Sequence, residues 1–482
     1  MQAGSASKGF WRVRYTVLGI MLTAWLFSFL DRMVMGIALP YIGADFNLTN
    51  EQLGLIMSAF FVGYALFQIP GGLLADKFGP RKVMAGAITW WSVFTSMTGL
   101  VFSLPIMLVV RCVFGIGEAA FPSASWKTIA TYFPSSQRAT ATAIQSCVNA
   151  LGPALATMAA ASIISMFGWR HVFVVLGLPG LLIALALYLY VRNDPKDHPG
   201  MSAEELKELE EDPGIVSLSA SGQEKPTFGQ LMRQPILWQM VIIWFAFDIT
   251  YWGFVSWLPS YLIKGRGFSL AELGLLGSLP FFVGTVALII GGFFSDNLKA
   301  KGVHRKWIFI PTCAIAAIAL YVTFKAETVT GSVTAQCVAA FFLFLAFAAF
   351  WGIVVDSIPP AIMGAGSATV NFGGQMAGIV AGWAVGKLID LNGGSFEWAF
   401  FFLMGGTILA LLVGYCVMGG GKRIIAFAST LVPIMGGLYV LVALVVIVMN
   451  VGLIPQVFGR IFSEAFDFQA IFAGFTGSAV MQ

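Results

Sequence analysis

Long apolar runs recur along almost the whole chain, and they restrict the possible folds more than any other feature. A helix needs about 20 predominantly apolar residues to cross the hydrocarbon core of a membrane. Hydrophobic residues make up 58% of the 482 residues and charged residues only 10%, whereas soluble domains contain roughly 25% charged residues. Twelve sufficiently long runs lie at 15–42, 53–75, 82–103, 105–126, 139–166, 171–191, 235–263, 271–295, 306–324, 333–355, 362–386 and 397–418, and a thirteenth lies at 429–450. The sequence therefore predicts an all-α polytopic membrane protein.

One long polar segment divides the first twelve runs into two sets of six. Residues 192–234 are rich in charged residues, Pro and Ser, and their acidic middle, SAEELKELEE, predicts a short helix. We predict an N-terminal six-helix bundle over 1–191, a cytoplasmic linker over 192–234 and a C-terminal six-helix bundle over 235–420. Residues 421–482 would add one further transmembrane segment and a Gly-rich tail. The linker is expected to be a solvated connector.

Basic residues are distributed unevenly between alternate connections, and this predicts the orientation in the membrane. The connections on the same side as the N-terminus contain most of the Lys and Arg residues, including Lys77, Arg81 and Lys82. Because such residues are enriched in cytoplasmic loops, we expect a cytoplasmic N-terminus. The net charge of +4 then follows from topology, and it does not indicate nucleic-acid binding.

Signatures of catalytic or metal sites are not apparent in the sequence. The five cysteines fall in apolar runs without the spacing of metal ligands, so we expect buried small hydrophobic residues and no disulfides. No nucleophile triad or phosphate-binding loop is recognisable. We therefore predict neither an enzyme nor a metal site.

The two halves of the chain contain similar sequences. EQLGLIMSAFFVGYALFQIPGGLLAD at 51–76 matches AELGLLGSLPFFVGTVALIIGGFFSD at 271–296, and the segments 134–152 and 360–378 can also be aligned. Duplicated six-helix halves suit alternating access, in which two bundles rock about a site at their interface. A purely structural duplication is the alternative, but it would not explain charged residues inside the spans.

Four charged residues lie deep inside the first and fourth predicted spans. In RCVFGIGEAAFPS at 111–123, Arg111 and Glu118 are two helical turns apart and therefore share one face of a helix. Asp31 and Arg32 in the first span reach a similar depth. Each such charge costs about 2.5–3.5 kcal/mol at the centre of a membrane, which marks these residues as functional candidates.

The chemistry of these side chains suggests their roles. The planar guanidinium groups of Arg32 and Arg111 suit a carboxylate, so both are predicted to bind an anion. In general, burial raises the pKa of a carboxyl group and a neighbouring arginine lowers it, so such a group can be poised to exchange a proton. Asp31 and Glu118 are therefore predicted to take up and release a proton. The alternative is that the four residues only form ion pairs that hold helices together.

Further polar residues lie at similar depths in other spans. Asp248 is either a second proton site or a hydrogen-bonding partner of a neighbouring helix. The sequence alone leaves both interpretations open. Five uncharged side chains are candidates to bind substrate, although each could also make an ordinary interhelical hydrogen bond. They are Gln145, Asn149, Tyr251, Asn371 and Gln375.

Several motifs make the chain similar to the major facilitator superfamily. GGLLADKFGPRK at 71–82 resembles the signature between its second and third helices, with a departure at Pro80, and 291–306 resembles a second copy. FLDRMVMGIALPYI, RCVFGIGEAAFPS and YWGFVSWLPSYL resemble the anion:cation symporter branch, which includes sugar-acid transporters and relatives of sialin and the vesicular glutamate transporters. The resemblance implies a 12-helix fold of two pseudo-symmetric six-helix bundles.

The resemblance also implies a function. We expect proton-coupled symport of a small organic anion, such as a hexonate or hexuronate. Asp31 and Glu118 would be the protonation sites, and Arg111 with Arg32 would act in substrate binding or coupling. The alternatives are a proton-independent facilitator or exchanger and a transporter-like sensor that does not transport.

The signature at 71–82 further implies a gate, in which Gly72, Asp76 and Arg81 latch the cytoplasmic side. No cofactor is expected, because the proton gradient would supply the energy. The expected partners are the organic anion, protons and the lipid bilayer, without nucleic acid. We expect a monomer in the inner membrane of a bacterium.

The last 60 or so residues have a different resemblance. The run from Leu431 to Phe466 is similar to a middle fragment of the alanine or glycine:sodium symporters. Such a fragment is too short to build a substrate and sodium site, so we predict a passive appendage. The alternative is an accessory helix for oligomer contacts.

Overall fold

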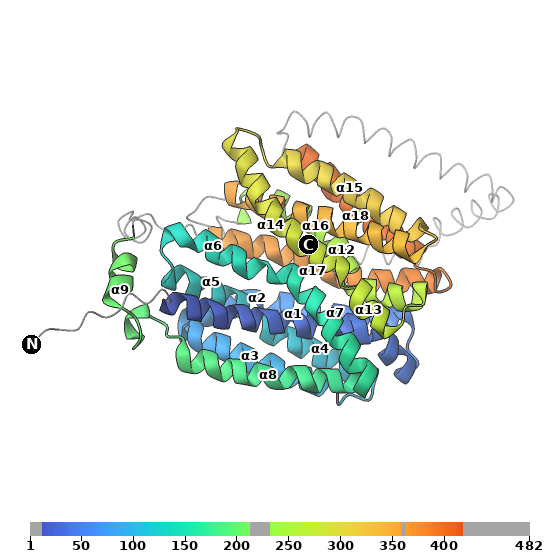
Figure 1. Ribbon diagram of the computed structural model, residues 1–482, viewed down its shortest axis with the longest axis horizontal. Helices are drawn as coiled ribbons and strands as arrows, with labels where there is room; N and C mark the ends of the chain where they lie inside the picture. The colour runs from blue at the N-terminus through green and yellow to red at the C-terminus, as the bar shows by residue number, and fades with distance from the viewer. Residues whose placement is uncertain (1–11, 213–231, 358–362, 418–482) are drawn as a thin grey trace, which may run out of the picture. The chain divides into compact units, whose positions relative to one another are not determined.

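The computed structural model describes residues 12–212, 232–357 and 363–417, and within these ranges all regular secondary structure is helical (Figure 1). The predicted thirteenth span at 429–450 and the Gly-rich tail lie outside the described residues. The N-terminal half contains eight helices, namely α1 (Val13–Phe46), α2 (Asn50–Phe78), α3 (Pro80–Thr98), α4 (Leu104–Ala119), α5 (Phe121–Tyr132), α6 (Ser135–Ser146), α7 (Val148–Phe167) and α8 (Trp169–Tyr190).

A short linker helix and the C-terminal half follow. The linker helix is α9 (Ala203–Glu210). The C-terminal half contains α12 (Pro235–Ser260) with a π-helical continuation (Tyr261–Gly265), α13 (Leu270–Leu276), α14 (Leu279–Ala300), α15 (Lys306–Lys325), α16 (Val329–Ser357), α17 (Met363–Leu391) and α18 (Glu397–Val417).

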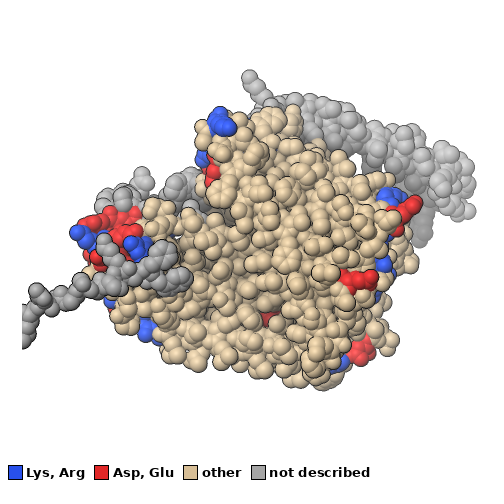
Figure 2. All heavy atoms as spheres, viewed as in Figure 1, with Lys and Arg blue, Asp and Glu red and all other residues tan. Residues whose placement is uncertain are grey.

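Ten of the described helical segments are long and apolar enough to cross a membrane. The helices α3 and α17 are not among these ten, but they occupy the positions of the third and eleventh predicted spans. The number and order of the predicted spans up to residue 417 therefore agree with the structure. On the face shown in Figure 2, charged side chains gather toward the ends of the helices and leave the long middle region almost uncharged.

Three of the predicted continuous spans consist of two helices each. The fourth span breaks between α4 and α5, the fifth between α6 and α7, and the eighth between α13 and α14. Pro122 and Pro280 lie in the first turns of α5 and α14. Proline lacks the N–H group that a helix interior needs and is tolerated in a first turn, which explains two of the breaks.

The two halves contact each other mainly through four pairs of helices. The helix α2 packs along α17, α7 packs against α13 and α14, and α1 packs against α12. We call the end of the helices where α1 begins the α9 end, and the end where α1 meets α2 the opposite end.

A polar cluster joins the halves at the opposite end. The Asp390 carboxylate of α17 accepts hydrogen bonds from the backbone N–H groups of Asn50 (3.1 Å) and Glu51 (2.6 Å) at the start of α2. Glu51 in turn accepts hydrogen bonds from Lys387 (2.8 Å) and Trp383 (3.1 Å). Asp390 thus caps a helix of the other half, and its negative charge lies at the positive end of the α2 dipole. We call these five residues the interhalf cap.

The linker helix α9 is not the solvated connector that the sequence predicts. Glu205 and Leu209 of α9 are buried, and Glu205 lies 3.4 Å from the buried guanidinium of Arg14 at the start of α1. Glu208 forms ion pairs with Arg14 and Arg12. The expectation failed because the acidic residues of α9 have basic partners at the start of α1, Arg14 in the helix and Arg12 just before it, that are nearly 200 residues away in sequence. Figure 1 shows α9 beside the starts of α1 and α6.

The surroundings of Glu208 set its ionisation. Partial burial by itself would raise the pKa of Glu208, but the hydrogen bond from Arg14 and the charges of Arg14 and Arg12 outweigh burial and lower this pKa. The ionised form, and with it the docking of α9, is therefore favoured.

Candidate functional site

A buried ion pair joins α1 and α4 in the N-terminal half. A guanidinium nitrogen of Arg32 donates a hydrogen bond to Oε1 of Glu118 over 2.8 Å, and the hydroxyl of Ser28, one turn earlier on α1, donates to the same oxygen. Arg32 is 4% exposed and Glu118 is 1% exposed. The second carboxylate oxygen of Glu118 has no hydrogen-bond partner among the described residues. The pair is thus desolvated but incompletely satisfied.

Asp31 and Arg111 complete the set of charges. Both are 2% exposed, and Asp31 interacts electrostatically with Glu118 and Arg111. Arg111 forms no ion pair with any described residue, and its guanidinium lies over the rings of Phe60 (5.3 Å) and Phe114 (4.8 Å). The structure therefore brings together the four charged residues that the sequence singles out, which we call the charge cluster.

Two glycines bring α2 and α4 close enough to build this region. A Cβ atom on Gly63 of α2 would lie 1.9 Å from the carbonyl oxygen of Cys112, and one on Gly115 of α4 would lie 2.2 Å from that of Phe60. Any larger residue would separate the two backbones. The close packing places Phe60 against both arginines of the charge cluster.

Aromatic rings surround Arg32 from both halves of the molecule. Its guanidinium lies 4.8 Å to 5.2 Å from the ring centroids of Phe29, Phe60, Tyr64 and Trp252. Trp252 belongs to α12, so the C-terminal half contributes one wall of the site. Cation–π contacts stabilise a guanidinium without neutralising its charge.

The predicted amide and hydroxyl residues are placed on the helices around this region. The Tyr251 hydroxyl donates to the backbone oxygen of Asn149 (3.2 Å), which is a contact between the two halves. Gln145 donates to the Ser125 hydroxyl (2.8 Å), and Gln375 donates to the Asn371 side chain (3.5 Å). These contacts position the side chains, and their role in substrate binding stays a prediction.

Among the described residues, the predicted gate residues contact the N-terminal half and the start of the linker, where Asn193 accepts a hydrogen bond from the backbone N–H of Arg81. Asp76 forms an ion pair with Lys127 (2.7 Å), and Arg81 donates to the backbone oxygen of Tyr188 (2.7 Å). Gly72 lies beside Ser123, whose hydroxyl would be 3.6 Å from an added Cβ. In this conformation the motif joins helices of one half, and the latch between halves stays a prediction.

Sequence reasoning missed the interhalf cap and the role of Ser28. The capping partners Asp390 and Asn50 are 340 residues apart, and the sequence offers no signal that pairs them. Ser28 could have been found, because it lies four residues before Arg32 and hence on the same face of α1.

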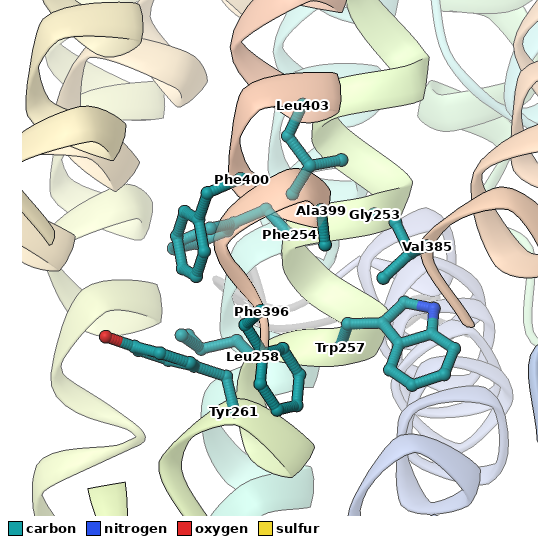
Figure 3. A pocket seen from close by; sticks show the side chains of 10 residues that line it. All are labelled: Gly253, Phe254, Trp257, Leu258, Tyr261, Val385, Phe396, Ala399, Phe400 and Leu403. Carbon is teal, nitrogen blue, oxygen red and sulfur yellow. The ribbon is translucent and has the colours of Figure 1, made fainter. Parts of the chain in front are cut away.

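A small pocket between α12, α17 and α18 has a mostly apolar lining. Figure 3 shows its apolar lining, which includes Phe254, Trp257, Val385 and Phe400. Its hydroxyl group, on Tyr261, donates to the backbone oxygen of Thr323 (3.2 Å). Among the described residues, no group of His, Cys, Asp and Glu side chains is arranged to hold a metal ion.

The fold and the charge cluster define a class of protein, which is a helical membrane protein with two similar halves and buried charges near their interface. A model of the Major Facilitator Superfamily matches residues 21–382, which is well over half of the chain. The chain therefore belongs to the Major Facilitator Superfamily. This confirms the family resemblance and the expected fold, and it places the chain among transporters and not among enzymes.

Curated proteins of bacteria show similarity over most of the chain. The “Probable sulfoacetate transporter” of Cupriavidus necator is 32% identical over 83% of this chain and 92% of its own length. The “Probable galactarate/D-glucarate transporter” of Escherichia coli is 30% identical over 85% of this chain and 96% of its own. The “Hexuronate transporter” of Bacillus subtilis is 28% identical over 82% and 92%, respectively.

Solved structures agree with this fold. A bacterial homologue of the human lysosomal transporter Spinster, in an inward-facing and unoccupied conformation, gives a TM-score of 0.67 at 21% identity and covers 85% of this chain and 96% of its own. The xylose transporter XylE of E. coli, in an inward-open conformation, gives a TM-score of 0.64 at 16% identity, with coverage of 83% and 95%.

The end of the chain matches a second family. A model of the sodium:alanine symporter family matches residues 377–482. This confirms the resemblance expected for the tail. The match begins within α17, well before the segment at 421–482 that the sequence singled out.

Proposed function

We propose that this protein is a secondary active transporter that moves a small organic anion together with protons by alternating access. The observation that carries the proposal is the charge cluster, in which two arginines and two carboxyl groups are buried between the helices. Substrates named for the relatives, namely a sulfoacetate, sugar diacids and hexuronates, are all organic anions. A hexonate, a hexuronate or a similar carboxylate is the substrate class that we favour.

Charge balance explains why protons would accompany the anion. When all four groups are ionised, the two positive charges of Arg32 and Arg111 cancel the two negative charges of Asp31 and Glu118. An entering anion adds one uncompensated negative charge in a region where water does not screen it. A proton on one of the two carboxyl groups restores neutrality.

Glu118 is the carboxyl group best placed for this exchange. Its ionised form holds Arg32 through the 2.8 Å hydrogen bond, so protonation of Glu118 would release the Arg32 guanidinium for the anion. Arg111, which forms no ion pair with the described residues, would provide the second guanidinium. A planar guanidinium can hold a carboxylate through two parallel hydrogen bonds.

The contacts between the halves fit one state of an alternating-access cycle. The described hydrogen bonds between the halves include the interhalf cap at the opposite end and Tyr251–Asn149 near the charge cluster. We propose that the cap holds the opposite end closed in this state. We further propose a cytoplasmic N-terminus, a monomeric protein and a location in the inner membrane.

Uptake into proteoliposomes with an imposed pH gradient tests the proposal. We expect a labelled hexonate or hexuronate to accumulate when the side from which it enters is acidic, and this accumulation should disappear when a proton ionophore is added. A proton-independent facilitator or exchanger would equilibrate the anion without accumulation. A sensor would bind the anion, as seen by a thermal shift, without any flux.

A further inference from the structure

A second group of buried polar atoms lies in the C-terminal half, between α12 and α17. Among the described residues, Oδ1 of Asp248 and the indole nitrogen of Trp244 have no hydrogen-bond partner, and the indole N–H of Trp252 interacts with the Asp248 side chain. Leaving such a group unpaired costs about 1–3 kcal/mol. Because buried polar groups are almost always paired in proteins, a concentration of orphaned atoms indicates a ligand that supplies the missing hydrogen bonds.

The helix geometry directs these atoms to one place. Trp244, Asp248 and Trp252 are spaced four residues apart and therefore lie on one face of α12. Gly374 of α17 faces them, since a Cβ there would be 2.0 Å from Oδ2 of Asp248 and 2.6 Å from the indole nitrogen of Trp244. The Asp248 carboxyl and the Trp244 indole N–H thus converge where α17 has no side chain.

This group of atoms is adjacent to the charge cluster. The ring of Trp252 lies 5.2 Å from the guanidinium of Arg32. Tyr251 interacts electrostatically with both Arg32 and Asp248. An anion whose carboxylate is held by Arg32 would therefore extend its other end along α12 toward Asp248.

The charges around Asp248 differ from those in the charge cluster. None of the ion pairs of the described residues involves Asp248, and its side chain interacts instead with the indole of Trp252. A ligand hydroxyl can hydrogen-bond this side chain in either state, because a hydroxyl donates to a carboxylate and accepts from a carboxylic acid. A ligand carboxylate can hydrogen-bond only the protonated form of Asp248. Binding of a carboxylate at this position therefore requires one more bound proton than binding of a hydroxyl.

We propose that Asp248, with the indole N–H groups of Trp244 and Trp252, forms a subsite for substrate hydroxyl groups and disfavours a second carboxylate. The inference rests on the proposed function and narrows its substrate class. The preferred substrate is a hydroxylated monoanion, such as a hexonate or hexuronate, and not a sugar diacid, such as glucarate. In this respect the chain would differ from its relatives that are named for galactarate and D-glucarate.

Counterflow in proteoliposomes tests the subsite without requiring a proton gradient. Vesicles that contain the full-length protein are loaded with unlabelled gluconate, which exchanges for labelled external gluconate at a slightly alkaline pH. Unlabelled gluconate or glucarate is added outside the vesicles as a competitor. We expect gluconate to compete about tenfold better than glucarate, since placing like charges together is strongly unfavourable. In Asp248→Asn this preference should fall severalfold, mainly because glucarate competes better. Asp45→Asn, at an exposed carboxylate that pairs with Arg170, is the matched control and should keep the wild-type preference.

A second variant keeps the test valid if Asp248→Asn does not fold. Trp244→Phe removes the indole N–H but keeps an aromatic ring, and it should weaken competition by gluconate severalfold. Equal competition by the two anions in the wild type, or an unchanged preference in Asp248→Asn, would overturn the subsite while leaving anion exchange intact. If no organic anion exchanges at all, the proposed function fails and the subsite fails with it.

Discussion

The two halves of the molecule have the same helical plan but opposite chemistry at their centres. The N-terminal half buries two arginines and two carboxyl groups between α1 and α4. The corresponding region of the C-terminal half packs Trp244 against Phe247, Phe347 and Phe350, and its buried acid is Asp248.

This difference indicates that the two halves, although built on the same helical plan, have different roles. Arginines and carboxyl groups are gathered in the N-terminal half, while the C-terminal half offers aromatic surfaces and hydrogen-bonding groups. Trp252 connects the two regions, because it belongs to α12 and contacts Arg32. Substitutions in the N-terminal half should therefore affect anion affinity and coupling most strongly.

The largest effect is expected for Arg111→Lys. The substitution keeps the positive charge but removes the planar fork that can hold a carboxylate through two hydrogen bonds. We expect the apparent affinity for the anion to fall about 10- to 100-fold, since a hydrogen bond to a charged group contributes about 1.5–3 kcal/mol. Initial rates of uptake as a function of anion concentration provide the measurement.

Arg170→Lys serves as the control for this substitution. Arg170 forms a half-exposed ion pair with Asp45 at the opposite end, so its replacement should leave the affinity unchanged. If Arg111→Lys also keeps the wild-type affinity, Arg111 has a structural role and the contrast between the halves loses its main support.

A smaller effect is expected where the halves meet, at Asp390. Asp390→Asn removes the negative charge from the start of α2, and such a charge contributes about 1 kcal/mol. The population that is open at the opposite end should therefore rise about fivefold. Spin labels at exposed positions 167 of α7 and 271 of α13 report the separation of the halves.

Asp45→Asn is the control, because Asp45 lies at the same end but pairs within its own half. A distance distribution that stays the same in Asp390→Asn would show that the interhalf cap does not hold the two halves together.

The smallest effect on transport is expected for α9, which docks on the N-terminal half. Glu205→Gln removes one buried partner of Arg14 but leaves Glu208 in place. Hydrogen exchange of the α9 amides should accelerate about tenfold, since an unsatisfied buried donor costs about 1–3 kcal/mol. Transport rates should change less than about twofold. Glu211→Gln, at an exposed residue of the same region, should leave the exchange rates unchanged.

The docking of α9 also has a predictable dependence on pH. Because the pKa of Glu208 is lowered in the folded protein, its contribution is fully present above the ordinary glutamate pKa of about 4.3 and is lost as the pH falls through the lowered value. Protection of α9 should therefore be constant between neutral pH and about pH 5. A loss of protection already near pH 6 would contradict this assignment.

The sequence allowed prediction of the spans and of the charge cluster for physical reasons. Apolar runs of sufficient length predict membrane helices because backbone polar groups must be satisfied within the helix. The seven-residue spacing of Arg111 and Glu118 predicts a shared face because it equals two helical turns. Both arguments depend on local sequence alone.

Other features depend on contacts between distant segments, and local sequence could not reveal them. Glu205 looks like an ordinary solvated acid until α1 places Arg14 beside it. Asp390 shows no sign of a capping role until α17 packs along α2. The breaks between paired helices are intermediate cases, because Pro122 and Pro280 are visible in the sequence but proline also occurs inside intact helices such as α1.

The central claim is that a carboxyl group in the charge cluster couples protons to anion movement, and Glu118→Gln tests it most directly. Glutamine keeps the shape and can still accept a hydrogen bond from Arg32, but it cannot exchange a proton. We predict that the variant retains anion counterflow and loses accumulation driven by a pH gradient, while Glu327→Gln, at an exposed position between α15 and α16, behaves as the wild type. Full accumulation by Glu118→Gln, with the wild-type dependence on pH, would contradict the account.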